Sequence, residues 1–167
     1  DIHSEVYRRD QAGKWHLLNS SKESGSRLDV LHTSADGNIY ASMDRTGAPA
    51  AFGTLDAASG EFTPLFRDEV SDVSAYITAV DGSERVIGVA TEAGAPKVTL
   101  LDENHPDAEL YASLAAAFPG QFVNFSNATA DGRQVIVGVY SDRNPGELYL
   151  FERDTGKARF LLNRRPW

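Results

Sequence analysis

The chain has 167 residues, of which 41% are hydrophobic and 24% charged, and it carries a formal net charge of −8. This composition is typical of a folded domain, and the acidic balance argues against a nucleic-acid partner, because phosphate binding requires a basic surface. There is no cysteine and no run of about 18 apolar residues, which excludes disulfides, thiolate metal sites and a predicted membrane-spanning helix.

Two short strands open the chain, at 4–9 and 14–18, joined by the turn sequence DQAG. We interpret this segment, 1–20, as the outer hairpin of a sheet whose inner half is missing. Runs between turns that are rich in β-branched and aromatic residues then predict a full unit over 28–67. Its four expected strands are 29–33, 38–43, 50–55 and 62–66.

The next unit, 72–112, has three clear strand patterns and a weak fourth. These are 73–79, 85–90, 97–101 and, weakly, 109–111. The helix candidate is 112–118, which Pro119-Gly120 would stop. The last unit, 120–163, again has four expected strands, at 121–126, 134–140, 147–153 and 158–162.

Two sets of turn residues recur with one period. Asp-Gly pairs begin at Asp36, Asp81 and Asp131, which are 45 and 50 positions apart. Asp-Gly suits a tight hairpin because glycine adopts positive φ without a steric clash. The second set, Asp10, Asp56, Asp102 and Asp154, is spaced by 46, 46 and 52 positions.

A period of roughly 40 to 50 residues that holds four short strands is typical of propeller blades. We therefore predict an all-β fold, a partial β-propeller of about three and a half four-stranded antiparallel blades, belonging to a longer chain. One blade cannot bury both faces of its sheet alone, so we expect uncovered blade faces to drive self-association.

The stretch 141–167 is more specific than a generic blade, and it resembles the last propeller blade of the prolyl oligopeptidase family. The branch that it resembles most contains acylaminoacyl-peptidase-like and dipeptidyl-aminopeptidase-like serine peptidases. Segment 105–121 is similar to the part of that family that precedes this blade. The matching residues are Ser141, Asp142, Arg143, Pro145, Gly146, Tyr149-Leu150-Phe151, Thr155-Gly156-Lys157 and Arg165-Pro166-Trp167.

The resemblance implies a propeller that filters peptide substrates by size above an α/β-hydrolase domain, which lies elsewhere in the parent protein. By propeller topology, loops 44–49, 91–96 and 141–146 are expected to face that domain, whereas the Asp-Gly turns point away. The implied partners are thus the hydrolase domain and a peptide substrate.

The chain itself offers little chemistry. No serine has glycine at both −2 and +2, so the nucleophile pattern G-x-S-x-G is absent, and we expect this segment to be catalytically inactive. The histidines are too far apart in sequence for a compact metal site, and the acidic stretch 101–109 lacks calcium-loop spacing and reads as a solvated loop. We expect no metal and no cofactor.

Arg143 is the candidate substrate-binding residue, because its loop could reach the hydrolase domain or a substrate. The alternative is an arginine that holds its own loop by hydrogen bonds to carbonyls. Two other functions stay open: a stand-alone propeller that binds a protein partner, as in periplasmic scaffolds, and an enzyme in its own right. The absence of cysteine is compatible with a bacterial cytoplasm or periplasm.

Overall fold

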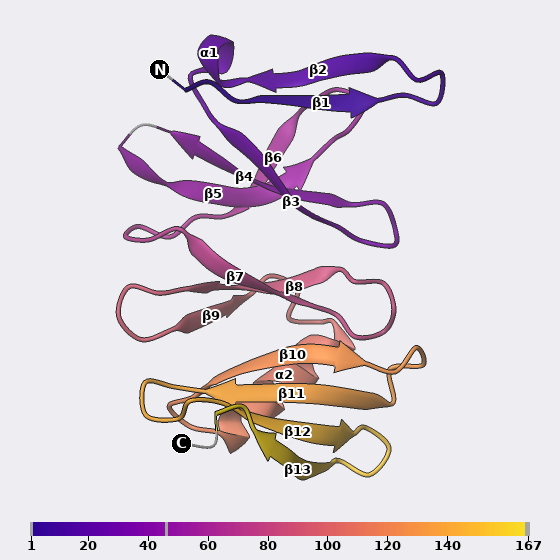
Figure 1. Cartoon of the computed structure of the whole chain (residues 1–167), viewed down its shortest axis with the longest axis vertical. Helices are drawn as coiled ribbons and strands as arrows, with labels where there is room; N and C mark the ends of the chain where they lie inside the picture. Colours follow the sequence, from indigo (N-terminus) through magenta and orange to yellow (C-terminus); the bar gives the residue numbers. More distant parts are fainter. Residues whose placement is uncertain (1, 46, 166–167) are drawn as a thin grey trace. The chain divides into compact units, whose positions relative to one another are not determined.

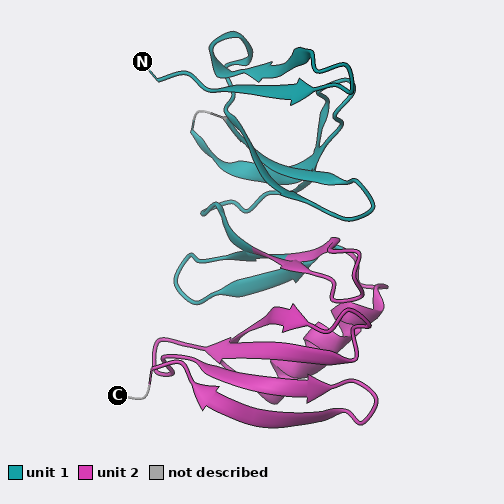
Figure 2. Ribbon diagram, turned by 45° about the vertical axis from the view of Figure 1, so that its right-hand side comes forward, with its two compact units in different colours: residues 1–75, 89–101 teal, residues 76–88, 102–167 magenta. Residues whose placement is uncertain are grey.

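The computed structural model describes residues 2–45 and 47–165, so Asp1, Thr46, Pro166 and Trp167 lie outside the described residues. Thr46 belongs to the expected loop 44–49, and Pro166-Trp167 are the last two residues of the stretch 141–167 described above. The chain divides into two compact units (Figure 2). One comprises Asp1–Ala75 and Val89–Leu101, and the other comprises Tyr76–Gly88 and Asp102–Trp167.

Strands make up about half of the described chain, and they come in four groups along it. The first group is β1 (Glu5–Arg9) and β2 (Trp15–Ser20), followed by the short helix α1 (Ser21–Ser24). The second is β3 (Leu28–Thr33), β4 (Ile39–Arg45), β5 (Ala48–Leu55) and β6 (Phe62–Phe66). The third is β7 (Val73–Thr78), β8 (Val86–Thr91) and β9 (Lys97–Leu100), followed by helix α2 (Pro106–Ala117). The last is β10 (Phe122–Ala128), β11 (Gln134–Tyr140), β12 (Glu147–Glu152) and β13 (Lys157–Asn163).

These groups form antiparallel sheets in which each strand is hydrogen-bonded to its neighbours in sequence (Figure 1). Among the described residues the sheets are β1-β2, β3-β4-β5-β6, β7-β8-β9 and β10-β11-β12-β13. This up-and-down order of four short strands is that of a propeller blade. The chain is therefore an all-β protein, a partial β-propeller, as the repeat predicts.

Strand β8 is buried on both faces, and β11 is fully buried on one face. All six residues of β8 are buried, and in β11 Val135, Val137 and Val139 are at most 1% exposed. The last strand of a sheet is more open, and β13 contains no buried residue. Apolar residues on both faces explain why the inner strands read as continuous hydrophobic runs rather than as an alternating pattern.

Two of the Asp-Gly turns share the same side-chain chemistry. In the turn at 34–37, Gly37 donates its N–H to the Ser34 carbonyl, and the Ser34 hydroxyl donates to Asp36 Oδ1. In the turn at 129–132, Gly132 donates to the Thr129 carbonyl, and the Thr129 hydroxyl donates to Asp131. Both glycines have positive φ, of 88° and 67°. The sequence [ST]-A-D-G therefore encodes one hairpin turn twice.

The strand expected at 109–111 is wrong, because these residues lie within α2. Pro106 stands in the first turn of this helix, where its missing N–H costs nothing, and His105 caps it by accepting from the Asp107 N–H at 3.1 Å. Tyr111 is buried and donates its hydroxyl to the Val123 carbonyl of β10 at 3.0 Å. Burial raises the pKa of Tyr111 to about 12. The third sheet thus has three described strands, and the expected helix at 112–118 begins six residues earlier.

The interpretation of 101–109 as a solvated acidic loop is also wrong for Asp107, which is 1% exposed. Its Oδ2 accepts from the Val80 N–H at 2.7 Å, and its Oδ1 lies 2.6 Å from Nη1 of Arg153 in an ion pair that lacks the angle of a hydrogen bond. Asp107 therefore joins three segments of one unit: the turn at 79–82, the start of α2 and the end of β12.

Removal of the Asp107 carboxylate should destabilise the fold strongly. Asp107→Ala leaves the Val80 N–H and the Arg153 guanidinium without their partner, and we expect it to lower the free energy of unfolding by about 3 to 5 kcal/mol. Glu109→Ala, at an exposed position of the same helix, is the control and should change it by less than about 0.5 kcal/mol. Urea titration measures both, and equal effects would contradict the assignment.

Two strand glycines are predicted to differ in their tolerance of a methyl group. A Cβ at Gly53 in β5 would overlap the Thr63 carbonyl and lie 2.9 Å from Pro64 Cα in the paired strand β6, so backbone would have to move. A Cβ at Gly138 meets only the side chain of Asn124, which can rotate. We expect Gly53→Ala to cost about 3 kcal/mol and Gly138→Ala about 1 kcal/mol in urea unfolding. The reverse order would refute the close approach of β5 and β6.

Candidate functional site

The candidate site lies at one end of the last sheet, where β11 ends and β12 begins. The connection is the loop 141–146. The chain that leaves β13 reaches the same end, because the Arg164 N–H donates to the Gly146 carbonyl at 2.7 Å. The loop and the outgoing chain are thus joined by a backbone hydrogen bond.

Ser141 shapes the first half of this loop. Its hydroxyl oxygen accepts from the N–H groups of Arg143 and Asn144, at 3.2 and 3.1 Å, and its own N–H donates to the Asn144 carbonyl at 2.9 Å. A serine that bonds to the backbone two and three residues ahead is a common way to stabilise a turn. The hydrogen bonds to Ser141 therefore fix the backbone of Arg143 and Asn144.

Asn144 fixes the second half and ties the loop to the start of β10. Its Nδ2 donates to Gln121 Oε1 at 2.6 Å, and its Oδ1 accepts from the Gly146 N–H at 3.0 Å. Gly146 has a φ of 123°, and a Cβ there would lie 2.9 Å from Arg164 Cδ, so a glycine is required. The contact between Gln121 and Asn144 spans 23 positions of sequence, and no local pattern signals it.

Arg143 projects from this fixed loop into solvent. Its side chain is 93% exposed, and Oδ2 of the similarly exposed Asp142 lies 4.0 Å from Arg143 Nε. Within residues 2–45 and 47–165, its guanidinium makes no hydrogen bond to a carbonyl of the loop. Ser141 and Asn144, rather than Arg143, hold the loop, so the guanidinium is available to an external group.

A hollow of about 580 Å³ opens beside the loop. Two guanidinium groups, three carboxamides and one carboxylate contribute to its wall. Glu147, the carboxylate, accepts from the Tyr149 hydroxyl at 2.8 Å. Burial, and then this hydrogen bond, raise the pKa of Tyr149. The lining residues are Gln121, Ser141, Arg143, Asn144, Pro145, Glu147, Asn163 and Arg165.

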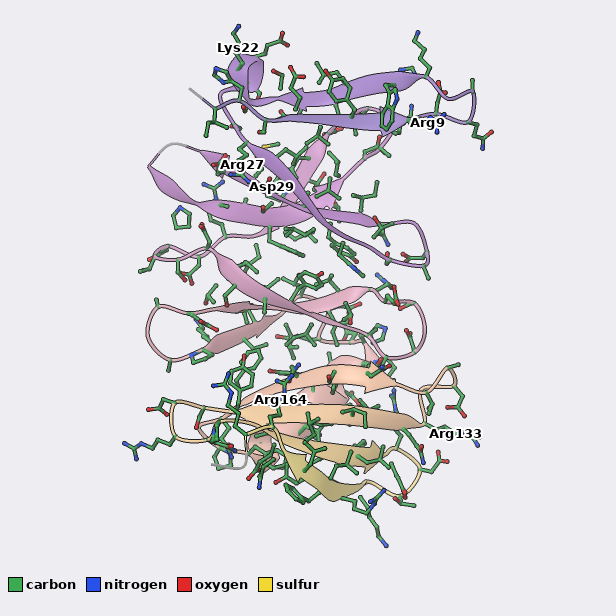
Figure 3. The ribbon with its side chains drawn as sticks, viewed as in Figure 1. Arg9, Lys22, Arg27, Asp29, Arg133 and Arg164 are labelled. Carbon is green, nitrogen blue, oxygen red and sulfur yellow. The ribbon has the colours of Figure 1, made fainter. Side chains whose placement is uncertain are left out.

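The opposite end of the same sheet has the opposite charge balance. Its hollow, of about 660 Å³, has three carboxylates and one arginine in its wall. Nε of Arg133 lies 3.9 Å from an oxygen of Asp131 and 3.9 Å from one of Asp154. The Thr129 hydroxyl, through its hydrogen bond, lowers the pKa of Asp131. Figure 3 shows Arg164 and Arg133 at the two ends of the sheet.

The described residues were compared with the patterns of metal sites and membrane-spanning helices. No group of three His, Cys, Asp or Glu side chains there could hold a metal ion, and no described helix is long and apolar enough to cross a membrane. Two histidines contact carboxylates: His16 Nε2 lies 2.7 Å from Asp10, and His105 Nε2 lies 3.5 Å from Asp81. Neither of these two contacts includes a serine hydroxyl.

Comparison with known proteins finds one distant structural neighbour. No protein-family model and no curated protein matches the chain. The crystal structure of TolB from Acinetobacter baumannii matches with 16% sequence identity and a TM-score of 0.49, covering 95% of this chain. The match covers 38% of the TolB chain. The assignment of the fold therefore depends on the order of the strands in this chain itself.

Asn144, and not Arg143, should determine the stability of the loop. Asn144→Ala removes the bonds to Gln121 and Gly146, and we expect the free energy of unfolding to fall by about 1 to 2 kcal/mol. Arg143→Ala, at the adjacent position with a side chain that is 93% exposed, is the matched control and should change it by less than about 0.5 kcal/mol. Urea unfolding measures both. A larger loss for Arg143→Ala would show that the arginine holds the loop.

Proposed function

We propose that this chain is a non-catalytic β-propeller segment of a prolyl-oligopeptidase-like serine peptidase, and that it gates peptide access to an α/β-hydrolase domain. The observation that carries the proposal is the blade formed by β10 to β13. It contains the Ser-Asp-Arg-x-Pro-Gly loop at 141–146, and its last strand leads to Arg165 beside that loop.

The geometry of this end suits a gate. The loop is held on one side by Ser141 and on the other by Asn144, so its shape does not depend on a bound ligand. A domain joined after β13 would start next to Gly146, where Arg164 is bonded. The gate would select peptides by size and charge, because a rigid rim excludes folded chains while an extended peptide can pass.

Bond cleavage would take place in the hydrolase domain. Acyl transfer from a peptide needs a serine nucleophile, a histidine base and oxyanion donors that converge on the scissile carbonyl. The role of this chain is then to hold and to select substrate, and its substitutions should change the apparent affinity for peptides more than the rate of the chemical step.

The test of this function uses the intact protein. A serine-directed fluorophosphonate should label one serine outside residues 1–167, and the protein should hydrolyse short aminoacyl and acyl-peptide chromogenic substrates. A peptide should be cleaved when free but spared when it is embedded in a folded protein. The control is heat-inactivated protein. Absence of labelling, or labelling of a serine within 1–167, would reject the proposal.

One observation favours a second candidate, a propeller that binds a protein partner. On the β1-β2 hairpin, Tyr7, Trp15 and Leu17 are 47%, 62% and 45% exposed, and the Arg9 guanidinium lies 6.0 Å from the Trp15 ring. Tyr7 and Leu17 are directly paired across the two strands. Exposed aromatic residues with an arginine are typical of interface cores. This apolar face could equally be covered by a second copy of the chain.

Sedimentation velocity distinguishes these roles. If the face binds a second copy or a partner, Trp15→Ser combined with Leu17→Ser should abolish the association and leave fluorophosphonate labelling unchanged. If the protein is neither labelled nor catalytic and still forms this complex, the binding role replaces the gating role.

A further inference from the structure

We propose that Arg143 and Arg165 form a carboxylate-binding site, and that the hollow between them takes an acidic segment of an extended peptide. The inference deepens the proposed function, on which it rests for the identity of the peptide as substrate. The binding itself requires no catalysis, so it can be tested separately.

The first argument is that one guanidinium is presented by a rigid support. The backbone N–H of Arg143 is bonded to Ser141 Oγ, and the next residue is locked to Gln121, so the Cα of Arg143 is fixed in the absence of ligand. Binding to a fixed loop avoids the entropy cost of ordering that loop. The side chain, 93% exposed, is not required to hold the loop, and is therefore free to serve recognition.

The second argument is the charge of the hollow. Arg143 and Arg165 line the hollow with one carboxylate, Glu147, which accepts from the Tyr149 hydroxyl. Asp142, which is not part of this wall, lies 4.0 Å from Arg143 Nε and is 88% exposed. The chain as a whole carries a net charge of −8, so a hollow with more guanidinium groups than carboxylates runs against the general charge of the protein. The corresponding hollow at the other end of the sheet has one arginine and three carboxylates.

The third argument is chemical. Arginine binds carboxylates through two parallel N–H···O bonds, which give both affinity and orientation. The side-chain amides of Asn144 and Gln121 are hydrogen-bonded to each other. The two arginines are the charged hydrogen-bond donors in the wall of the hollow. A volume of about 580 Å³ accommodates a few residues of an extended peptide, within the range of ligand sites. The ligand class is therefore a peptide with glutamate or aspartate side chains.

The probe is a blocked, dye-labelled peptide of alanine and glycine with two adjacent glutamates, compared with the same peptide carrying glutamines. Fluorescence anisotropy is measured on the intact protein after treatment with the fluorophosphonate, so that no peptide is consumed. At an ionic strength of about 0.01 M, where the Debye length is about 30 Å, we expect the glutamate peptide to bind at least about tenfold more tightly.

The variants locate the site. Arg143→Ala combined with Arg165→Ala should remove the preference for glutamate, and Arg143→Lys should retain part of it, since lysine keeps the charge but loses the two parallel bonds. Arg133→Ala is the matched control, because it removes an arginine of the same sheet at the opposite end and should keep the full preference. Circular dichroism shows whether each variant is folded.

The outcomes separate this inference from the proposed function. Equal binding of both peptides, or equal loss in the Arg133→Ala control, would overturn the carboxylate site. Glutamate-selective binding that depends on the two arginines, in a protein that fluorophosphonate does not label, would support the site and reject the peptidase role. Peptide hydrolysis without any preference for glutamate would reject the site and support the role.

Discussion

The structure depends on one constraint: inner strands that are apolar on both faces must be covered on both faces. All six residues of β8, from both faces of the strand, are buried. A single sheet of this kind could not remain exposed to water, because burial of apolar area is the main favourable term in folding. The repeat of short antiparallel sheets follows from this constraint, since each copy of the unit supplies cover that a lone sheet lacks.

The turns between the strands are also required for this burial. Each [ST]-A-D-G turn reverses the chain within a few residues and thereby holds the register that keeps the apolar residues inside.

Helix α2 occupies the place in the chain where a fourth strand was expected, and it is held by a buried, paired carboxylate. Where a fourth strand would complete the sheet of β7 to β9, the chain forms a helix whose first turn carries the buried Asp107. The carboxylate is compensated by the Val80 N–H and by Arg153. Taking a carboxylate out of water is costly unless it is paired in this way. The pair connects segments that lie far apart in the sequence, so α2 becomes part of the core of its unit instead of a surface connection.

The two ends of the last sheet differ in charge balance and in which side chains hold them together. This difference underlies both proposals. The end with the Asp-Gly turn carries Arg133 between two carboxylates, so its charge is internally compensated. At the other end the loop polar groups compensate one another, while Arg143 extends into water. A gate needs a firm rim, and a recognition site needs donors that the rim itself does not use. The hydrogen bonds of Ser141 and Asn144 satisfy the first requirement and leave the arginine for the second.

The sequence alone determined the repeat, most of the strands and their turns, because these depend on local chemistry: runs of β-branched and aromatic residues, Asp-Gly pairs and a fixed period. It also singled out Arg143 and the loop around it. It failed where distant residues decide. Residues 109–111 have strand-like composition, yet Pro106 and the His105 cap, with Asp107 held by Val80 and Arg153, make them helical. The role of Asn144 was invisible for the same reason, since its partner Gln121 lies 23 positions earlier in the sequence, just before β10. Only the tertiary structure brings such pairs within hydrogen-bonding distance, and so only it distinguishes an arginine that supports its loop from one that the loop presents.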